Sequence, residues 1–135
     1  MKNLLLAIAR CIFGLFYAGI GAIGAYRVLT DPNAEWPAFN DAEKALTSAL
    51  TAAGFFVPTV ILTCLTGGIL LLFKRTTPIG LLVLTPLIGV IFLYHAYLTG
   101  AYIHAAPQAA YLGILYWFYR DAFVPLWNYG RSADT

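Results

Sequence analysis

Four long apolar stretches constrain this chain more than any other feature of its sequence. They run approximately over 4–29, 55–73, 79–98 and 109–126, close to the length of about 20 residues that crosses a bilayer as a helix. Only 10% of the 135 residues are charged, against about 25% in soluble domains. Because backbone groups in lipid must be hydrogen-bonded internally, the pattern predicts an all-α membrane protein, a four-transmembrane-helix bundle in a single domain.

A shorter helix is expected between the first two apolar stretches, over about 41–53. Alanine and leucine recur there at helical spacing. Asn40 is placed to cap this helix, Glu43 follows three residues later as in a capping box, and Gly54 suits its end. The segment therefore predicts a short amphipathic interfacial helix that lies on the outer membrane face between helices one and two.

The basic residues predict the orientation of the four spans. Six of the eight Lys and Arg residues fall on the side that carries both termini, and only Arg27 and Lys44 fall on the other side. The positive-inside rule then indicates a multi-pass protein of the bacterial cytoplasmic (inner) membrane with cytoplasmic N- and C-termini. The net charge is only +2 and the basic residues are scattered, which argues for the lipid bilayer and against nucleic acid as a partner.

His95 is the ionisable residue that stands out in the third apolar stretch, within "FLYHAYL" near its outer end. Ionisable groups inside a membrane are costly, so each one is a candidate for function. A neutral imidazole could hydrogen-bond a quinone, ligate a haem or a pigment, or relay a proton. It could equally make a structural hydrogen bond between helices, which we take as the favoured role.

A second polar group is expected at the inner face, where Arg10, Arg120 and Asp121 form a cluster. Arg10 could extend to the cytoplasmic headgroups, or pair with Asp121, an anionic headgroup or a substrate. Arg120 and Asp121 are adjacent on a helix, so they are expected to point in different directions and to need separate partners.

The remaining motifs predict structure rather than chemistry. Cys11 and Cys64 form no CxxC motif and lie in apolar runs, where thiols are inert, although a redox pair at similar depth is an alternative. We expect no catalytic residue and no metal site. Small residues are expected to allow close helix packing at Gly14, Ala18, Ala22, Gly67 and Gly68.

Nearly the whole chain resembles the DoxX-like family of small membrane proteins. The segment "GGILLLFKRTTPIGLLVLTPLIGVIFLYHAYL" is similar to the family's central region, "AIARCIFGLFYAGIGAIG" to its first helix and "WFYRDAFVPLW" to the end of its last helix. The resemblance implies four membrane helices with both termini inside, and some relatives are subunits of thiosulfate:quinone oxidoreductase. The family-like identities in this chain are Arg10, Pro78, Pro86, His95, Arg120 and Asp121.

Two departures from the family pattern bear on the expected function. Cys64 stands where relatives often carry a glutamate, and Val90 where they often carry an asparagine. Because quinone chemistry would need such polar groups, the resemblance favours a non-catalytic accessory or structural subunit of a larger redox or energy-converting membrane complex. The alternative is a membrane subunit of a quinone-linked oxidoreductase with His95 at the quinone, and a weaker one has His95 as the ligand of a pigment or haem.

Overall fold

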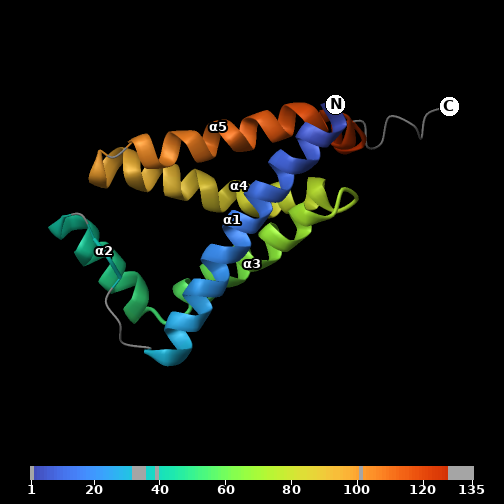
Figure 1. Ribbon diagram of the computed structural model, residues 1–135. Coiled ribbons are helices and arrows are strands. Elements are labelled where there is room, and N and C mark those ends of the chain that lie inside the picture. The colour runs from blue at the N-terminus through green and yellow to red at the C-terminus, as the bar shows by residue number, and fades with distance from the viewer. Residues whose placement is uncertain (1, 32–35, 39, 101, 128–135) are drawn as a thin grey trace.

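The computed structural model describes residues 2–31, 36–38, 40–100 and 102–127, and these residues are almost entirely helical (Figure 1). No strand forms within the described ranges. The helices are α1 (Lys2–Thr30), α2 (Asp41–Ala52), α3 (Phe56–Leu72), α4 (Thr77–Tyr94), the π-helix η1 (His95–Thr99), α5 (Tyr102–Tyr119), the 3₁₀-helix η2 (Arg120–Ala122) and α6 (Val124–Trp127).

The first four expected helices agree with the structure to within two residues at each end, if η1 is counted with α4. The expected helix over 109–126 is displaced, because the structure has α5 at Tyr102–Tyr119. The sequence "TGAYIHAAPQ" suggested a loop, yet the helix runs through Pro107. A proline removes one backbone donor, and here the helix accommodates that loss within its second turn. Beyond Tyr119 the chain tightens into η2.

The apolar helices are compatible with a multi-pass membrane protein. Two of the described helical stretches, Leu4–Thr30 and Thr77–Thr99, are long and apolar enough to cross a bilayer. A third span is counted if α2 and α3, which are bent by 91° at their junction, are taken together. Gly54 allows that bend because its φ of 77° lies in the left-handed region that favours glycine.

Small residues let α1 and α3 lie in direct backbone contact. A Cβ atom built on Gly68 would lie 2.4 Å from the backbone nitrogen of Ala18 and 2.7 Å from the carbonyl oxygen of Gly14. Gly21 continues this contact against Leu65, whereas Ala22 is exposed. The expected roles of Gly14, Ala18, Gly67 and Gly68 in helix packing are confirmed, and Gly21 takes the place of Ala22.

The buried core lies toward the end of the molecule where α1 begins, which we call the N-terminal end. Leu71, Leu81, Leu84 and Leu115 are fully buried there. Aromatic side chains connect α1 to α5, since the Tyr17 hydroxyl donates to the Gln108 side-chain oxygen (2.8 Å) and the Tyr111 hydroxyl donates to the Ala9 carbonyl (2.9 Å). The rings of Phe13 and Tyr111 also stack, with their centroids 4.8 Å apart.

The two helix pairs diverge away from this core (Figure 1). The pair α1 and α3 and the pair α4 and α5 meet near the N-terminal end and separate toward the opposite end, where α2 lies across the opening. We call this opposite end the α2 end. The wedge between the pairs is the place where the fold leaves a cavity.

Candidate functional site

A cavity of about 500 Å³ lies in the wedge between α1, α2, α3 and α4. We call it the α2 cavity. Its volume falls within the range of about 300–1,000 Å³ typical of ligand pockets, and like them it has a mostly apolar wall with a few polar groups. The residues that matter for the argument below are Gly21, Leu50, Val60, Cys64, Ile91 and His95.

His95 lies in the wall of the α2 cavity, at the first position of η1. Its Nδ1 atom is 2.8 Å from the carbonyl oxygen of Ile91, one turn earlier. Its ring also stacks on that of His104 in α5 at 6.4 Å and meets the Tyr94 ring edge-on at 5.3 Å. We expected a structural hydrogen bond between helices, but the bond that Nδ1 makes is to the preceding turn of its own helix. The remaining ring nitrogen, Nε2, is left for another role.

The π-helical turn that begins at His95 is itself a feature of interest. A single π turn in an α-helix is uncommon and is often found at functional sites. Here it precedes Gly100, whose φ of 65° ends the helix in the left-handed conformation. The Leu98 carbonyl in this turn accepts a hydrogen bond of 2.8 Å from the Asn40 side-chain nitrogen. This hydrogen bond holds the start of α2 against the π turn.

A polar face of α2 holds this helix against the α2 end of α4. The Asn40 oxygen caps α2 by accepting from the Glu43 backbone N–H (2.8 Å), as expected from sequence. The hydroxyls of Thr47 and Tyr94 are 3.4 Å apart, and the Glu43 carboxylate lies near the Tyr94 hydroxyl. These contacts hold α2 across the wedge beside the cavity.

Glu43 is the residue that sequence reasoning missed, because it was interpreted only as part of a capping box. It is 4% exposed, while the alanine-rich face of α2 (Ala42, Ala45, Ala49 and Ala53) is exposed. A signal was present in the sequence, since Glu43, Thr47 and Thr51 recur every fourth residue and form a polar stripe on an otherwise alanine-rich helix. The helix thus turns its polar stripe toward the protein, places Leu46 and Leu50 in the cavity wall and leaves its alanines outside.

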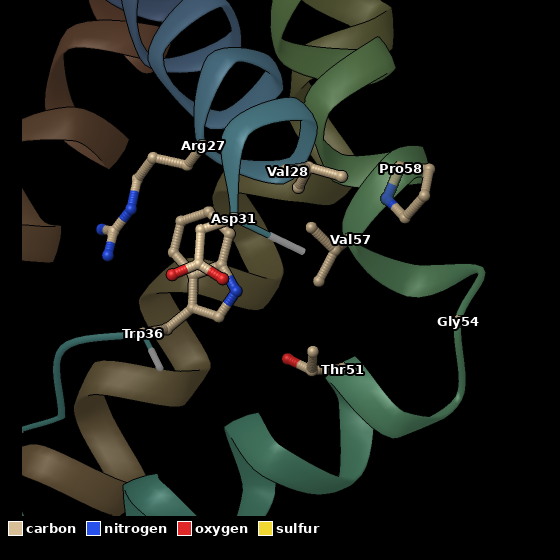
Figure 2. Close-up of a pocket in the computed structure, with 8 residues that line it drawn as sticks. All are labelled: Arg27, Val28, Asp31, Trp36, Thr51, Gly54, Val57 and Pro58. Atoms are coloured by element: carbon tan, nitrogen blue, oxygen red, sulfur yellow. The ribbon is translucent and has the colours of Figure 1, made fainter. Parts of the chain in front are cut away.

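A smaller cavity of about 180 Å³ lies beside the α2 cavity and shares part of its wall (Figure 2). Its side chains come from the end of α1, the end of α2 and the start of α3. The guanidinium of Arg27 lies over the Trp36 ring, 5.0 Å from its centroid. Such a cation–π contact is worth about 0.5–2 kcal/mol and fixes Trp36, which lines both cavities. This contact supports the wall of the α2 cavity.

The expected inner-face cluster is divided in the structure. Arg10 is buried and donates from Nη1 to the Thr77 hydroxyl at 3.1 Å. Asp121 does not pair with Arg10, because its carboxylate lies 3.7 Å from the Nε of its neighbour Arg120. Both of those side chains are exposed, and the expectation that adjacent Arg120 and Asp121 need separate partners is wrong. The turn from α-helix to 3₁₀-helix at Arg120 changes the direction of the two side chains.

The cysteines and the other ionisable groups add no second centre. Cys11 and Cys64 are both free thiols, and Cys64 is buried in the wall of the α2 cavity. Within the part of the chain that the structure describes, no three His, Cys, Asp or Glu side chains gather as a metal site would require.

The fold and the cavity define a class, namely an all-helical protein with apolar, membrane-length helices and an apolar cavity lined in part by a short amphipathic helix. Comparison with protein-family models, with curated proteins and with solved structures finds no match to this chain. The functional argument therefore rests on the site itself.

Proposed function

We propose that the chain is a four-span integral membrane protein of DoxX type in the bacterial inner membrane, with both termini in the cytoplasm. The spans are α1, α3, α4 with η1, and α5, and α2 lies at the outer surface. The bend of 91° between α2 and α3 supports this arrangement, since it turns α2 nearly perpendicular to the adjoining span. The exposed alanine face of α2 is then available to lipid.

The function that the geometry supports best is the binding of a lipophilic ligand with a polar head in the α2 cavity. The observation that carries this proposal is the position of His95, a polar ring in the wall of an apolar space of about 500 Å³. An apolar tail would contact the residues deeper in the wedge, such as Val60 and Leu87. The head would lie at the α2 end, beside His95.

The hydrogen bond at Nδ1 determines what kind of head His95 can bind. A carbonyl oxygen only accepts, so the ring proton resides on Nδ1 and is donated to Ile91. In the neutral imidazole, Nε2 is then an acceptor. A ligand hydroxyl can donate to this atom, whereas an oxidised quinone, whose carbonyl oxygens only accept, cannot. Among quinones the geometry therefore favours the reduced, hydroxyl-bearing quinol.

The residues present fit a quinol-type ligand. His95 would orient the head, and the Cys64 thiol, also in the cavity wall, offers only a weak donor. A bound quinone would supply two-electron redox chemistry, while this chain binds the reduced form and orients it. The departures at Cys64 and Val90 are consistent with that binding role, because both residues extend the apolar wall of the cavity.

Replacing His95 with leucine is expected to weaken the binding of duroquinol about threefold to tenfold, the value of one ordinary hydrogen bond. Equilibrium dialysis of the detergent-purified protein against duroquinol and duroquinone, under reducing and oxidising conditions respectively, measures both forms. Tyr97→Leu is the control, because it removes an exposed polar ring from the same π turn that is not part of the cavity wall. No binding of duroquinol by the wild type, or equal binding by His95→Leu, would contradict the proposal.

An accessory-subunit role is the second proposal, and two glycines favour it. Gly89 in α4 and Gly113 in α5 are exposed, and a Cβ atom on either would meet nothing within 4 Å. Glycines on an outer helix face permit the close approach of a helix from another subunit. Purification in a mild detergent is expected to yield a complex larger than the single chain. A protein that migrates as a single chain in its detergent micelle would contradict this role.

A further inference from the structure

Arg10 is a buried cation whose hydrogen bonding is incomplete. It lies in the stretch Leu4–Thr30, which is long and apolar enough to span a membrane, and its exposed fraction is 7%. Its Nη1 donates to Thr77, a fully buried hydroxyl that itself donates to the Phe73 carbonyl at 2.9 Å. Its Nε atom is buried and has no hydrogen-bond partner among the described residues. One neutral partner therefore serves a group with five N–H donors.

No carboxylate in the described ranges neutralises Arg10. Asp41 and Glu43 lie in α2, at the opposite end of the molecule, and Asp31 lies just beyond the end of α1. Asp121 is at the N-terminal end, but its side chain is 91% exposed and pairs with Arg120. A buried ion without a counter-charge is costly, and charged groups inside membrane helices are normally paired.

The surroundings of Arg10 carry further positive charge. Lys74 and Arg75 are exposed in the turn between α3 and α4, and Arg75 is two residues before Thr77, which Arg10 contacts. Arg10 itself is six residues beyond Leu4, about 9 Å along the helix, a depth near the headgroups if the span begins there. A potential of this sign attracts anions to the N-terminal end of the molecule.

We propose that Arg10 binds an oxyanion of the phosphate type at the N-terminal end of the bundle, with Thr77 fixing the guanidinium. A guanidinium is a strong donor to phosphate oxygens, and Thr77 occupies only the Nη1 donor. Nε is covered by the protein, so a phosphate contacts the guanidinium through its Nη atoms. The phosphate comes either from a lipid headgroup or from free phosphate. This site lies at the other end of the molecule from the α2 cavity and does not depend on the function proposed for that cavity.

The test compares the wild type with Arg10→Gln in dodecyl maltoside, a neutral detergent. Phosphatidylglycerol and phosphatidylcholine are titrated separately, and the bound lipid is counted by native mass spectrometry. Inorganic phosphate is titrated in a second arm and followed by thermal unfolding. We expect the wild type to bind one phosphatidylglycerol in preference to phosphatidylcholine, and Arg10→Gln to bind it at least about tenfold more weakly, as the loss of a charge-assisted hydrogen bond implies.

Arg120→Gln is the matched control, since it removes an exposed guanidinium at the same end of the molecule and is expected to leave lipid binding unchanged. A saturable rise in Tm with inorganic phosphate that Arg10→Gln lacks would assign free phosphate as the source. If the wild type shows neither response, the proposal is overturned, whatever happens to the stability of the variants. Equal responses in the wild type and Arg10→Gln would overturn it as well.

Discussion

Replacing Gly68 with alanine is expected to force α1 away from α3 and to destabilise the fold by about 1–3 kcal/mol or more, the cost of inserting a methyl group into a filled interface. The added Cβ would lie 2.4 Å from the nitrogen of Ala18 and 2.7 Å from the carbonyl oxygen of Gly14. Both are backbone atoms, so no side-chain rotation can relieve the clash. Intrinsic fluorescence of the three tryptophans during unfolding measures the loss.

Gly113→Ala is the control, because it is the same substitution but is not expected to lower the stability of the fold. Gly113 is in the interior of α5, where an added Cβ meets nothing within 4 Å. Alanine is about 1 kcal/mol more favourable than glycine in a helix, so this variant should be as stable as the wild type or more so. If the two alanine variants unfold at the same temperature, the close contact of α1 with α3 does not exist as described.

Replacing Ile91 with tryptophan is expected to abolish ligand binding in the α2 cavity without unfolding the protein. Ile91 is in the cavity wall one turn before His95, so an indole there would occupy the space beneath the imidazole. The backbone carbonyl that orients His95 is retained. Binding of duroquinol should fall below detection in equilibrium dialysis, a larger loss than that of His95→Leu, because the substitution removes volume rather than one hydrogen bond.

Leu93→Trp is the control for Ile91→Trp. Leu93 is 54% exposed and is not part of the cavity wall, so the same bulky ring two residues later should leave binding unchanged. Duroquinol bound equally well by Ile91→Trp and the wild type would show that the ligand lies outside the α2 cavity. That result would also separate a real cavity ligand from quinol partitioned into the detergent micelle.

The helices that the sequence predicts well are those whose signals are local. Apolar length predicts α1, α3 and α4, and the Asn40 cap with Gly54 predicts the bounds of α2, because these interactions lie within a few residues of the chain. The start of α5 was missed because Pro107 and its polar neighbours are typical of a loop. Only the tertiary contact of Gln108 with Tyr17, 91 residues away, shows why that segment is helical and packed.

Of the candidate site, the sequence predicted only one residue. His95 could be identified because an imidazole in an apolar run is conspicuous, yet the cavity beside it is formed by four helices and has no local signature. The orientation of α2 follows from Glu43 and Thr47 meeting Tyr94, a pairing of distant residues that the periodicity of α2 alone does not specify. The division of Arg10 from Asp121 likewise depends on a change of helix type at Arg120.

The unequal lengths of the helices have a consequence for the thickness of the membrane around the protein. α3 contains 17 residues and α5 contains 18, lengths of about 26 and 27 Å, whereas the 29 residues of α1 extend about 44 Å. A typical hydrocarbon core is about 30 Å thick, so in the proposed four-span arrangement α3 and α5 match it only where the bilayer is slightly compressed, and α1 lies oblique. Lipids with shorter acyl chains should therefore gather around α3 and α5, and the protein would sort toward thinner regions of its membrane.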